Sequence, residues 1–476
     1  MVFSSSLFLL FFLPLFLGVY FLAPTRFKNI VILVFSIGFY MWGAPKFIFV
    51  ILASIVINYL LSKKIYQSKD EQHRKRWLIV SVILNVSVLL YFKYSNFFIE
   101  NINLLLSDFG LRSLAWVNIV LPIGISFFTF HALSYIIDVY RGVNKPMNRL
   151  TDYAVYILLF PQLIAGPIIR YKEIANQIID RKSQETIDNK LTGMLRFIIG
   201  LSKKVLIANT LGVEVDKIFA LPQEYLTTSL AWIGIIAYAL QIYFDFSGYS
   251  DMAIGIARMI GFYFPENFNN PYIAQNITEF WKRWHMSLSR WMRDYLYIPL
   301  GGNRVKTKAR LYFNLWIVFL ISGFWHGASW NFIVWGAYHG FFLICDRLFF
   351  IRFTEKAGRI PSTLITFIIV LVGWVFFRSE NLHSAFVYLE KMFSFNFMSP
   401  LSIPINNKVW FFIAFGLFVS MMGSVKWIET LENKFYQGRI TLSAQAGLTV
   451  ACAALFVICL GSITSSGFNP FIYFQF

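Results

Sequence analysis

Two histidines within otherwise apolar sequence are the residues best suited to chemistry in this 476-residue chain. His326 lies in the run SGFWHGAS at 322–329, and His285 lies in the run EFWKRWHMS at 279–287. An ionisable group inside a bilayer costs free energy that packing alone does not recover, so its presence there indicates a function. A neutral imidazole can accept a proton from an attacking hydroxyl, which predicts general base catalysis by these residues.

His326 is expected to lie deep in a membrane span. It ends an apolar run that starts at Leu311, and about 15 residues of helix extend roughly 22 Å. The residues around it are small enough to let a helix or ligand approach, or carry a hydroxyl that can orient a ring nitrogen. These are Ser322, Gly323, Gly327 and Ser329. The alternative is that Trp325 and His326 belong to an aromatic belt at the membrane interface.

The segment 276–296 places apolar residues at the spacing of one helical face. This pattern predicts a single amphipathic helix with His285, Trp281 and Trp284 on its apolar side. A basic amphipathic helix usually lies in the membrane interface, which is the structural alternative to a functional role. Such a helix does not need a histidine on its buried side, and this favours the functional interpretation.

A third polar cluster lies at the end of an apolar run, in QIYFDFSGYSD at 241–251. Its aspartates, Asp245 and Asp251, can steady a histidine or line a polar path, although Asp and Ser most often cap helices. The run PQLIAGP at 161–167 breaks a helix at membrane depth, which is a feature of cavities. The candidate substrate-binding or tunnel-lining residues are Asp245, Ser247, Tyr249, Trp281, Trp284, Ser322 and Trp325.

Other kinds of site find no support in the sequence. It contains no phosphate-binding glycine loop, dinucleotide fingerprint, HExxH zinc motif or GxSxG elbow. The three cysteines form no CxxC pair, so neither a disulfide framework nor a thiolate metal site is predicted. We therefore expect no metal and no bound cofactor. Among the remaining histidines, His339 is expected to be a packing or interfacial residue.

The composition indicates an all-α polytopic membrane protein. Hydrophobic residues make up 57% of the chain and charged residues only 14%, too few to cover a soluble protein of this length. The 42 Lys and Arg outnumber the 24 Asp and Glu, but they occupy short loops between apolar runs. This pattern marks cytoplasmic loops and contact with anionic membrane lipids, and it argues against nucleic-acid binding.

Apolar runs long enough to cross hydrocarbon predict about 11–12 transmembrane helices. The expected spans lie near 3–23, 29–43, 47–62, 77–93, 114–139, 192–208, 227–246, 311–328, 331–350, 362–378, 409–425 and 443–462. The segments 153–169 and 248–300 are interrupted by Pro, Gly and charge, and are expected to form re-entrant or interfacial helices. No linker separates a soluble domain, so residues 1–476 are expected to form one integral-membrane domain.

The basic loops predict the orientation of the chain. When successive spans cross the membrane in alternating directions, one side receives the basic loops 63–76, 141–149, 170–190 and 304–310. The positive-inside rule places that side in the cytoplasm. The N-terminus and the acidic loop 213–224 then face outward. The opening run 2–22 lacks a basic start, and Pro24 argues against cleavage there, so we expect a retained first span.

Several motifs in order resemble those of the membrane-bound O-acyltransferases, the MBOAT family. They are PIGISFFTF (122–130), FPQLIAGPIIR (160–170), YFDFSGYSD (243–251), EFWKRWHMSLS (279–289) and FWHGASW (324–330). The core motifs occupy about 120–345, and the resemblance extends over essentially the whole chain. Within the family the chain is most similar to the branch that O-acetylates alginate. It is more distantly similar to the branch that D-alanylates teichoic acid.

The resemblance implies a fold of transmembrane and re-entrant helices around a central tunnel. It implies a transferase that takes an acyl group from a cytoplasmic thioester, acetyl-CoA or another acyl thioester, for O-acetylation of an exported cell-envelope polymer or exopolysaccharide. The family's invariant histidine falls on His326 and its second histidine on His285, while His131 receives no role. The implied partner is a periplasmic or extracellular SGNH-type acetyltransferase or acceptor protein, and the implied location is the bacterial inner membrane.

Two alternative functions remain open at this stage. A teichoic acid D-alanyltransferase would share the motifs but carry a different acyl group. A transporter or channel would also place His and Asp inside the membrane. Against the second alternative, the two halves of the chain show no equivalent pair of broken helices.

Overall fold

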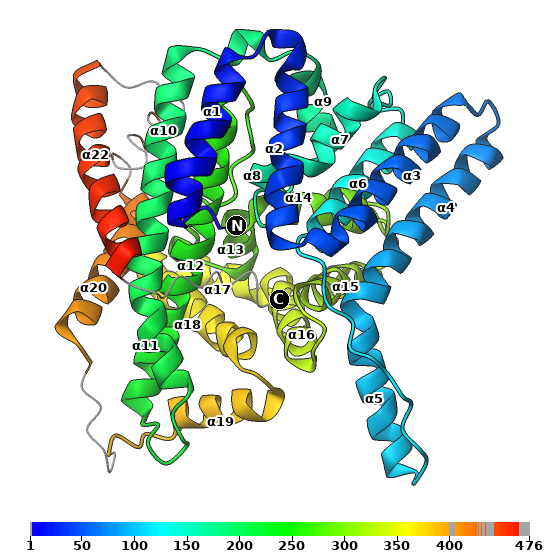
Figure 1. Cartoon of the computed structure of the whole chain (residues 1–476). Coiled ribbons are helices and arrows are strands. Elements are labelled where there is room, and N and C mark those ends of the chain that lie inside the picture. Colours follow the sequence, from blue (N-terminus) through cyan, green and yellow to red (C-terminus); the bar gives the residue numbers. More distant parts are fainter. Residues whose placement is uncertain are drawn as a thin grey trace. The chain divides into compact units, whose positions relative to one another are not determined.

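Helices and the turns and loops between them make up the described part of the chain, and no strand occurs there (Figure 1). The structure is a computed structural model that describes residues 2–398, 405–425, 427, 430, 434 and 442–465. The chain divides into two compact units. The first contains Leu7–Thr186 and Ile260–Phe264, and the second contains Phe3–Ser6, Ile187–Met259 and Pro265–Phe476. The expectation that residues 1–476 form one integral-membrane domain remains a prediction.

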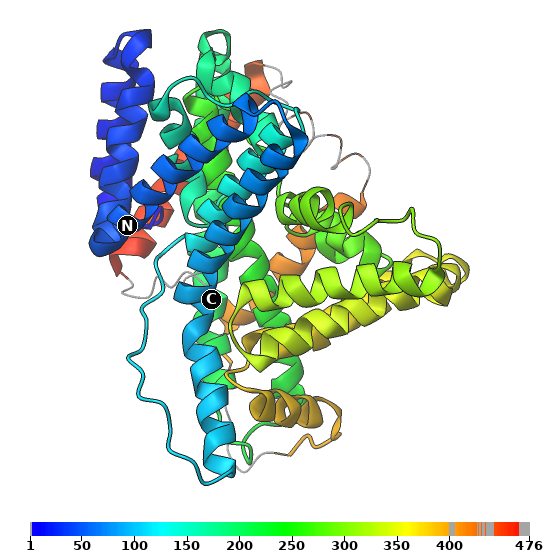
Figure 2. The same cartoon turned by 90° about the vertical axis from the view of Figure 1, so that its right-hand side faces the viewer.

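The first unit is built from helices of very different lengths. The helices α3 and α4 lie side by side and both pack on α6 (Figure 2). The helices of this unit are α1 (Leu13–Leu22), α2 (Lys28–Gly43), α3 (Ile48–Gln67), α4 (Glu71–Leu89), α5 (Ser95–Asp108), α6 (Ile125–Tyr140), α7 (Leu150–Leu158), α8 (Phe160–Leu163) and α9 (Tyr171–Ile179).

The second unit is organised around α12, which is 32 residues long and buried along most of its length. Its helices are α10 (Ile187–Ser202), α11 (Asn209–Phe219), α12 (Thr228–Met259), α13 (Ile277–Arg283), α14 (Met286–Met292), α15 (Lys308–His326), α16 (Trp330–Cys345), α17 (Ile351–Ala357), α18 (Arg359–Arg378), α19 (Leu382–Phe393), α20 (Asn407–Met421) and α22 (Leu442–Ser465). The helices α15 and α16 form a hairpin, and α10 packs along α12 (Figure 2).

Seven helical stretches in the described residues are long and apolar enough to cross a membrane, which confirms a polytopic membrane protein. They are Pro45–Gln67, Glu71–Asp108, Thr228–Met259, Trp330–Ala357, Arg359–Arg378, Asn407–Ser424 and Ser443–Ser465. Two shorter apolar helices cover Phe8–Leu22 and Ile125–Tyr140. The expected spans 29–43, 192–208 and 311–328 are helical as α2, α10 and α15, but do not belong to either set.

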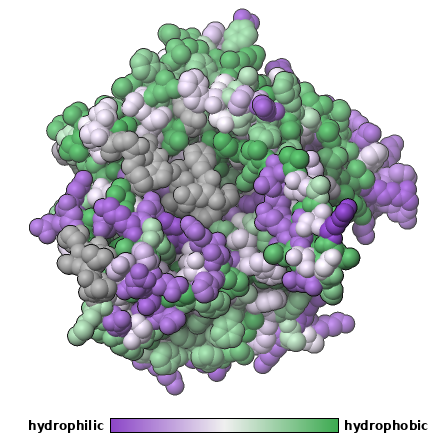
Figure 3. Space-filling view, turned by 60° about the horizontal axis from the view of Figure 1, so that its bottom comes forward, coloured by the Kyte–Doolittle hydropathy of each residue, from purple (hydrophilic) through white to green (hydrophobic). Residues whose placement is uncertain are grey.

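Large apolar side chains remain exposed on the outer faces of these helices. Leu10, Phe11, Val34 and Phe49 are examples, and they lie on helices of the first unit. Figure 3 shows hydrophobic residues spread over much of the surface in that view, with groups of hydrophilic residues between them. Contiguous exposed apolar surface of this kind is typical of contact with lipid.

The expected span 114–139 begins later than its apolar sequence suggested. Residues 111–122 are not helical, and α6 begins at Ile125. Pro122 restricts the residue before it to extended conformations, and Gly124 adopts a left-handed conformation with φ of 76°. Pro122 and Gly124 together delay the start of the helix to Ile125, so the prediction of a helix over residues 114–124 was wrong.

The expected break in α12 after residue 246 was also wrong, because the helix continues through Gly248 and Gly255 to Met259. A Cβ atom at Gly248 would lie 2.6 Å from the carbonyl oxygen of Gly200, and one at Gly255 would lie 2.5 Å from that of Gly193. The glycines of α12 therefore let α10 approach backbone to backbone. Such close packing of small residues stabilises helix pairs in membranes and offsets the low helix propensity of glycine.

Candidate functional site

His285 lies at a sharp break between α13 and α14. Its backbone is left-handed, with φ of 43° and ψ of 52°, and it directly precedes the first residue of α14. The prediction of one continuous amphipathic helix over 276–296 was therefore wrong. A left-handed conformation costs a residue with a Cβ about 1–2 kcal/mol, so neighbouring contacts must stabilise it.

Asn267 supplies those contacts. Its backbone carbonyl accepts from the N–H of Met286 at 2.9 Å, and its side-chain Oδ1 accepts from the N–H and the hydroxyl of Ser287 at 3.2 and 2.8 Å. The same Oδ1 lies 3.1 Å from Nδ1 of His285. Asn267 thus binds both the imidazole and the first turn of the following helix.

This arrangement determines the tautomer of His285. A backbone N–H can only donate, so the Asn267 atom that receives the Ser287 N–H must be the oxygen. Because that oxygen is an acceptor, the neutral ring of His285 must carry its proton on Nδ1. The lone pair is then on Nε2, which is the nitrogen able to act as a base.

Burial keeps this imidazole neutral. His285 is 1% exposed, and its ring packs edge-on against Phe246 with centroids 4.7 Å apart. Desolvation lowers the pKa of His285 from 6.5 to about 3. A neutral ring of defined tautomer is the form that general base catalysis requires at neutral pH.

His326 is the last residue of α15 and is also buried. Its ring packs against Trp335 at 5.1 Å and Phe377 at 5.3 Å between centroids. One turn earlier, Gly323 contacts the backbone of Phe332 and Gly336 on α16 so closely that a Cβ there would clash. Gly323 therefore lets α16 approach, which was one of the two roles expected for it.

Trp325 contacts both histidine rings. Its ring centroid lies 4.8 Å from that of His326 and 6.4 Å from that of His285. The two imidazoles come from segments 41 positions apart in the sequence, and the fold brings both to one indole. Trp325, itself one of the predicted site residues, thus contacts both predicted histidines.

The two aspartates of the third cluster form ion pairs instead of capping a helix. Asp245 lies within α12 and pairs with Lys204 at 2.7 Å, and both side chains are nearly inaccessible. Asp251, also within α12, contacts Arg196 at 2.8 Å and Lys203 at 2.7 Å. Capping was the commonest fate expected for these residues, and their positions inside a continuous helix exclude it.

A π-helical stretch makes these pairings possible. It covers Lys203–Ala208, directly after α10, and lies against α12. An extra residue in a helical turn rotates the side chains that follow, and such turns are frequent at functional sites. Here the consecutive residues Lys203 and Lys204 reach two different aspartates, about 1.7 turns apart on α12.

Asn267 also links the turn at His285 to α12, next to Asp251. Nδ2 of Asn267 donates to the hydroxyl of Ser250 at 3.0 Å, and Ser250 directly precedes Asp251. Ser250, Asp251 and Asn267 line a small cavity together with Ser247 and Tyr243. Asn267 was not among the residues predicted from the sequence, because nothing local in it marks an asparagine 18 positions before a histidine as its partner.

The remaining predicted residues are buried in packing positions. Tyr249 stacks on Phe3 with centroids 4.6 Å apart, and Trp284 packs against Trp374 at 4.9 Å. Trp281 packs edge-on against His339 at 5.1 Å. His339 is fully buried among aromatic rings, in keeping with the packing role expected for it, and Ser322 is buried in α15.

The fold and this site define an all-helical integral-membrane protein with a pair of buried histidines. The model of the membrane-bound O-acyltransferase family matches residues 81–386, and the chain belongs to that family. It is therefore an O-acyltransferase of the membrane. The matched range contains both histidines, Asn267 and the ion pairs of α12.

Comparison with curated relatives places the chain within the family. It is 42% identical to a probable alginate O-acetylase, AlgI, of Azotobacter vinelandii, over the full length of both chains. It is 39% identical to a peptidoglycan O-acetyltransferase of Helicobacter pylori, over 84% of this chain and 81% of the relative. A teichoic acid D-alanyltransferase of Bacillus subtilis is 30% identical, over 56% of this chain and 71% of the relative.

Proposed function

We propose that this protein transfers acetyl groups from a cytoplasmic thioester for O-acetylation of an exported polysaccharide. The relatives that it matches along most of their length are named for O-acetylation of alginate and of peptidoglycan. The observation that carries the proposal is the pair of buried imidazoles that share contacts with Trp325. A pair of neutral bases in an apolar site fits proton removal from a hydroxyl.

The proposed step is acyl transfer with a histidine as general base. The acceptor oxygen forms a bond to the thioester carbonyl carbon, and the carbon–sulfur bond breaks. The hydroxyl proton moves to an imidazole nitrogen and then to the departing thiolate. We assign the principal role to His326 and a second role in the same step to His285, whose Nε2 holds the lone pair. General base catalysis contributes about 10²- to 10⁴-fold.

The donor and the partner follow from the same proposal. We infer that the donor is acetyl-CoA or another acyl thioester, and that its charged part stays at the basic cytoplasmic loops. The acceptor side then faces outward, where an SGNH-type acetyltransferase or an acceptor protein would receive the acetyl group. The protein would lie in the bacterial inner membrane with its N-terminus outside, following the distribution of Lys and Arg.

A second candidate function is D-alanylation of teichoic acid. The identity of 30% to a teichoic acid D-alanyltransferase favours it, but that match covers only 56% of this chain. An O-acetylase matches the whole chain at 42%. Acetyl is also the smaller and uncharged group, and it enters an apolar passage at a lower desolvation cost than a D-alanyl group with its ammonium.

A labelling experiment tests the proposal. Membranes that contain the protein are incubated with acetyl-CoA or with D-alanyl carrier protein, each radiolabelled in the acyl group, together with candidate acceptor proteins. We expect label from acetyl-CoA on an acceptor, and none when both His285 and His326 are replaced by alanine. Label from D-alanyl carrier alone would support the second candidate, and no label from either donor would contradict acyl transfer.

A further inference from the structure

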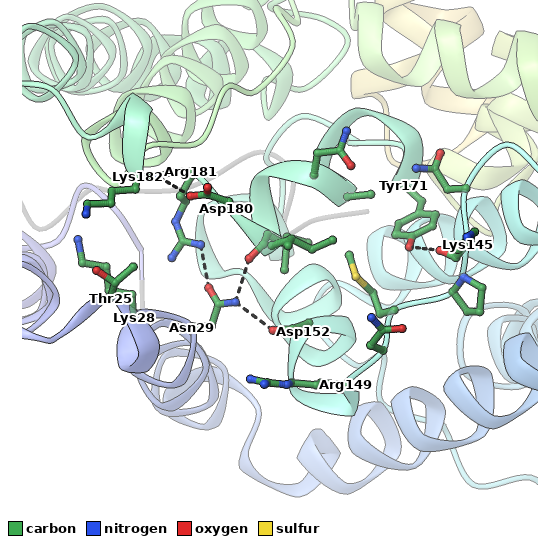
Figure 4. A pocket seen from close by; sticks show the side chains of 18 of the residues that line it. Thr25, Lys28, Asn29, Lys145, Arg149, Asp152, Tyr171, Asp180, Arg181 and Lys182 are labelled. Atoms are coloured by element: carbon green, nitrogen blue, oxygen red, sulfur yellow. Dashed lines mark hydrogen bonds between the residues drawn. The ribbon is translucent and has the colours of Figure 1, made fainter.

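The first unit contains a large cavity with an excess of positive charge. Its volume is about 900 Å³, and six Lys or Arg side chains line it against three Asp or Glu side chains. The lining comes from the turn before α2 and the start of α2, the loop before α7, α7 itself, α9 and the turn after α9. Here it is called the basic cavity (Figure 4).

One wall of the basic cavity is held in place by partly buried polar contacts. Nη1 of Arg181 donates to Oδ1 of Asn29 at 2.8 Å, and Nδ2 of Asn29 donates to Asp152 at 3.0 Å. Figure 4 shows Arg181 and Asn29 next to each other on this wall, with Tyr171 and Lys145 on the other side. Lys28 forms an ion pair with Glu185 in the same wall. The wall is therefore built before any ligand enters.

The acids of the cavity are already engaged in these contacts. Glu185 binds Lys28 and Asp152 binds Asn29, while Asp180 accepts from the backbone N–H of Lys182 at 3.0 Å. Four cations have no carboxylate within 4 Å among the residues that the structure describes. They are Arg26, Lys145, Arg149 and Lys182. Their charge is not balanced by the protein, so an anion that enters the cavity would be attracted to it.

The size and chemistry of the basic cavity indicate the class of ligand. Arginine presents a fork of donors that matches a phosphate, and lysine adds a point charge. The volume is that of a site for a complete small molecule, well above the space that a phosphate ion needs. Apolar side chains such as Met147 and Ile178 also line it, and can contact the organic part of a ligand.

We propose that the basic cavity binds a phosphate-bearing ligand through Arg149 and Lys182, with Arg26 and Lys145 contributing at its edge. The site belongs wholly to the first unit, whereas His285 and His326 belong to the second. The loops 141–149 and 170–190 that line it are among the basic loops assigned above to the charged part of the donor, but binding in the cavity is tested without acetyl transfer. The phosphate can come from the headgroup of an anionic lipid or from a soluble phosphate ester, and the experiment distinguishes these sources.

The test measures binding to the full-length protein in a non-ionic detergent. The two probes are short-chain phosphatidylglycerol for the lipid source and ADP for the soluble source. Short-chain phosphatidylcholine, which has no net charge, is the reference. We compare the wild type with Arg149→Gln/Lys182→Gln, and with the matched control Arg352→Gln/Lys356→Gln. The control removes the same charge from exposed positions on α17 in the second unit.

We expect saturable binding of at least one charged probe, weakened tenfold or more in the cavity variant and less than twofold in the control. Binding of phosphatidylglycerol alone identifies a lipid site, and binding of ADP identifies a site for soluble phosphate esters. The variant Arg149→Lys/Lys182→Arg keeps both charges and should retain most of the affinity. The proposal is overturned if neither probe saturates, or if the cavity variant and the control weaken binding equally.

Discussion

Oδ1 of Asn267 lies 3.1 Å from Nδ1 of His285, and the same oxygen accepts two hydrogen bonds from Ser287. One side chain therefore orients the imidazole, fixes the tautomer that leaves the lone pair on Nε2, and stabilises the turn at His285. Asn267 also donates to Ser250, next to the Asp251 ion pairs on α12. We interpret it as a positioning residue for the proposed base.

Replacing Asn267 should therefore reduce acyl transfer through His285. In Asn267→Ala the ring loses the acceptor at Nδ1, both tautomers become populated, and we expect a decrease in transfer rate of about 10- to 100-fold. In Asn267→Asp the acceptor is kept, and the added carboxylate raises the pKa of His285. We expect this variant to retain more activity, with the acid limb of its pH profile moved to higher pH.

The control for this series is Asn269→Ala, which removes an exposed asparagine two positions away. Transfer of labelled acetyl is measured across pH 5 to 8 at equal amounts of folded protein. A positioning role moves the pH profile, whereas a merely structural role lowers activity equally at every pH. Identical profiles for the Asp variant and the wild type would exclude the proposed role of Asn267.

The sequence predicted helices formed by continuous apolar runs more accurately than helices whose continuity depends on packing against another helix. The expected spans 362–378 and 443–462 agree within a few residues with Arg359–Arg378 and Ser443–Ser465. Hydrophobic length alone decides where such helices lie. In α12, by contrast, Gly248 and Asp251 look like a break until Gly200 and Arg196 of α10, and Lys203 of the π-helical stretch after it, pack against them.

The candidate site shows the same limit. The histidines and Trp325 could be selected from their residue types, because ionisable groups in apolar sequence are costly. The turn at His285 could not be predicted, since apolar spacing continues through it and Asn267, 18 positions earlier, stabilises the left-handed backbone. Partners such as Asn267 and Lys204 lie far away in the sequence and become neighbours only through packing.

Removal of His326 should abolish transfer without removing the protein. We expect His326→Ala to lower acetyl transfer by at least about 100-fold, as for loss of a general base. Its abundance in the membrane should stay near that of the wild type. Abundance is measured by immunoblot and transfer by radiolabel, with the exposed His383→Ala as the matched control.

A contrast is expected for His339, which is fully buried against Trp281 and Trp335. His339→Ala leaves a cavity among aromatic rings, so the amount of folded protein should decrease while activity per folded molecule is kept. If His326→Ala instead lost the protein, or retained more than a small fraction of its activity, the catalytic assignment would be wrong.

The stability of the folded protein should depend on Lys204 and Asp245 being present or absent together. Replacing only Lys204 with Met leaves a buried carboxylate without its cation, which costs about 3–5 kcal/mol. The double variant Lys204→Met/Asp245→Leu removes both charges and should recover most of that stability. Thermal unfolding of the detergent-solubilised protein measures both effects.

The matched control is Lys217→Met, which removes an exposed cation paired with Glu214 on α11 and should change stability little. Recovery of stability together with recovery of activity would identify the pair as structural. Stability without activity in the double variant would show that one of these charges also acts in transfer. Failure of the double variant to recover stability would contradict the pairing.

Acidification should destabilise the protein partly through His285. Its pKa of about 3 lies below the unfolded value near 6.5. Between these values the unfolded chain binds a proton that the folded chain does not. The stability contributed by the neutral ring is therefore complete above about pH 6.5 and is lost as the pH falls toward 3.

In His285→Gln this contribution disappears, so the melting temperature should fall less between pH 7.5 and pH 5 than in the wild type. The exposed His383→Gln should behave like the wild type. Thermal unfolding of all three proteins at both pH values checks the prediction. An equal loss on acidification in His285→Gln and the wild type would show that the ring is not buried in its neutral form.

The orientation of the chain can be tested with single cysteines at Lys69, Lys306 and Glu224, all of which are exposed. The loop expected at 213–224 proved shorter, because α11 continues to Phe219, so Glu224 is the better position. If the basic loops face the cytoplasm, a membrane-impermeant thiol reagent should label only the cysteine at 224 in intact cells. In permeabilised cells the reagent should label all three cysteines.

The native cysteines are buried, and replacing them with alanine removes background labelling. Labelling at 69 and 306 with protection at 224 would reverse the topology, and with it the direction of transfer from a cytoplasmic donor to an outer acceptor.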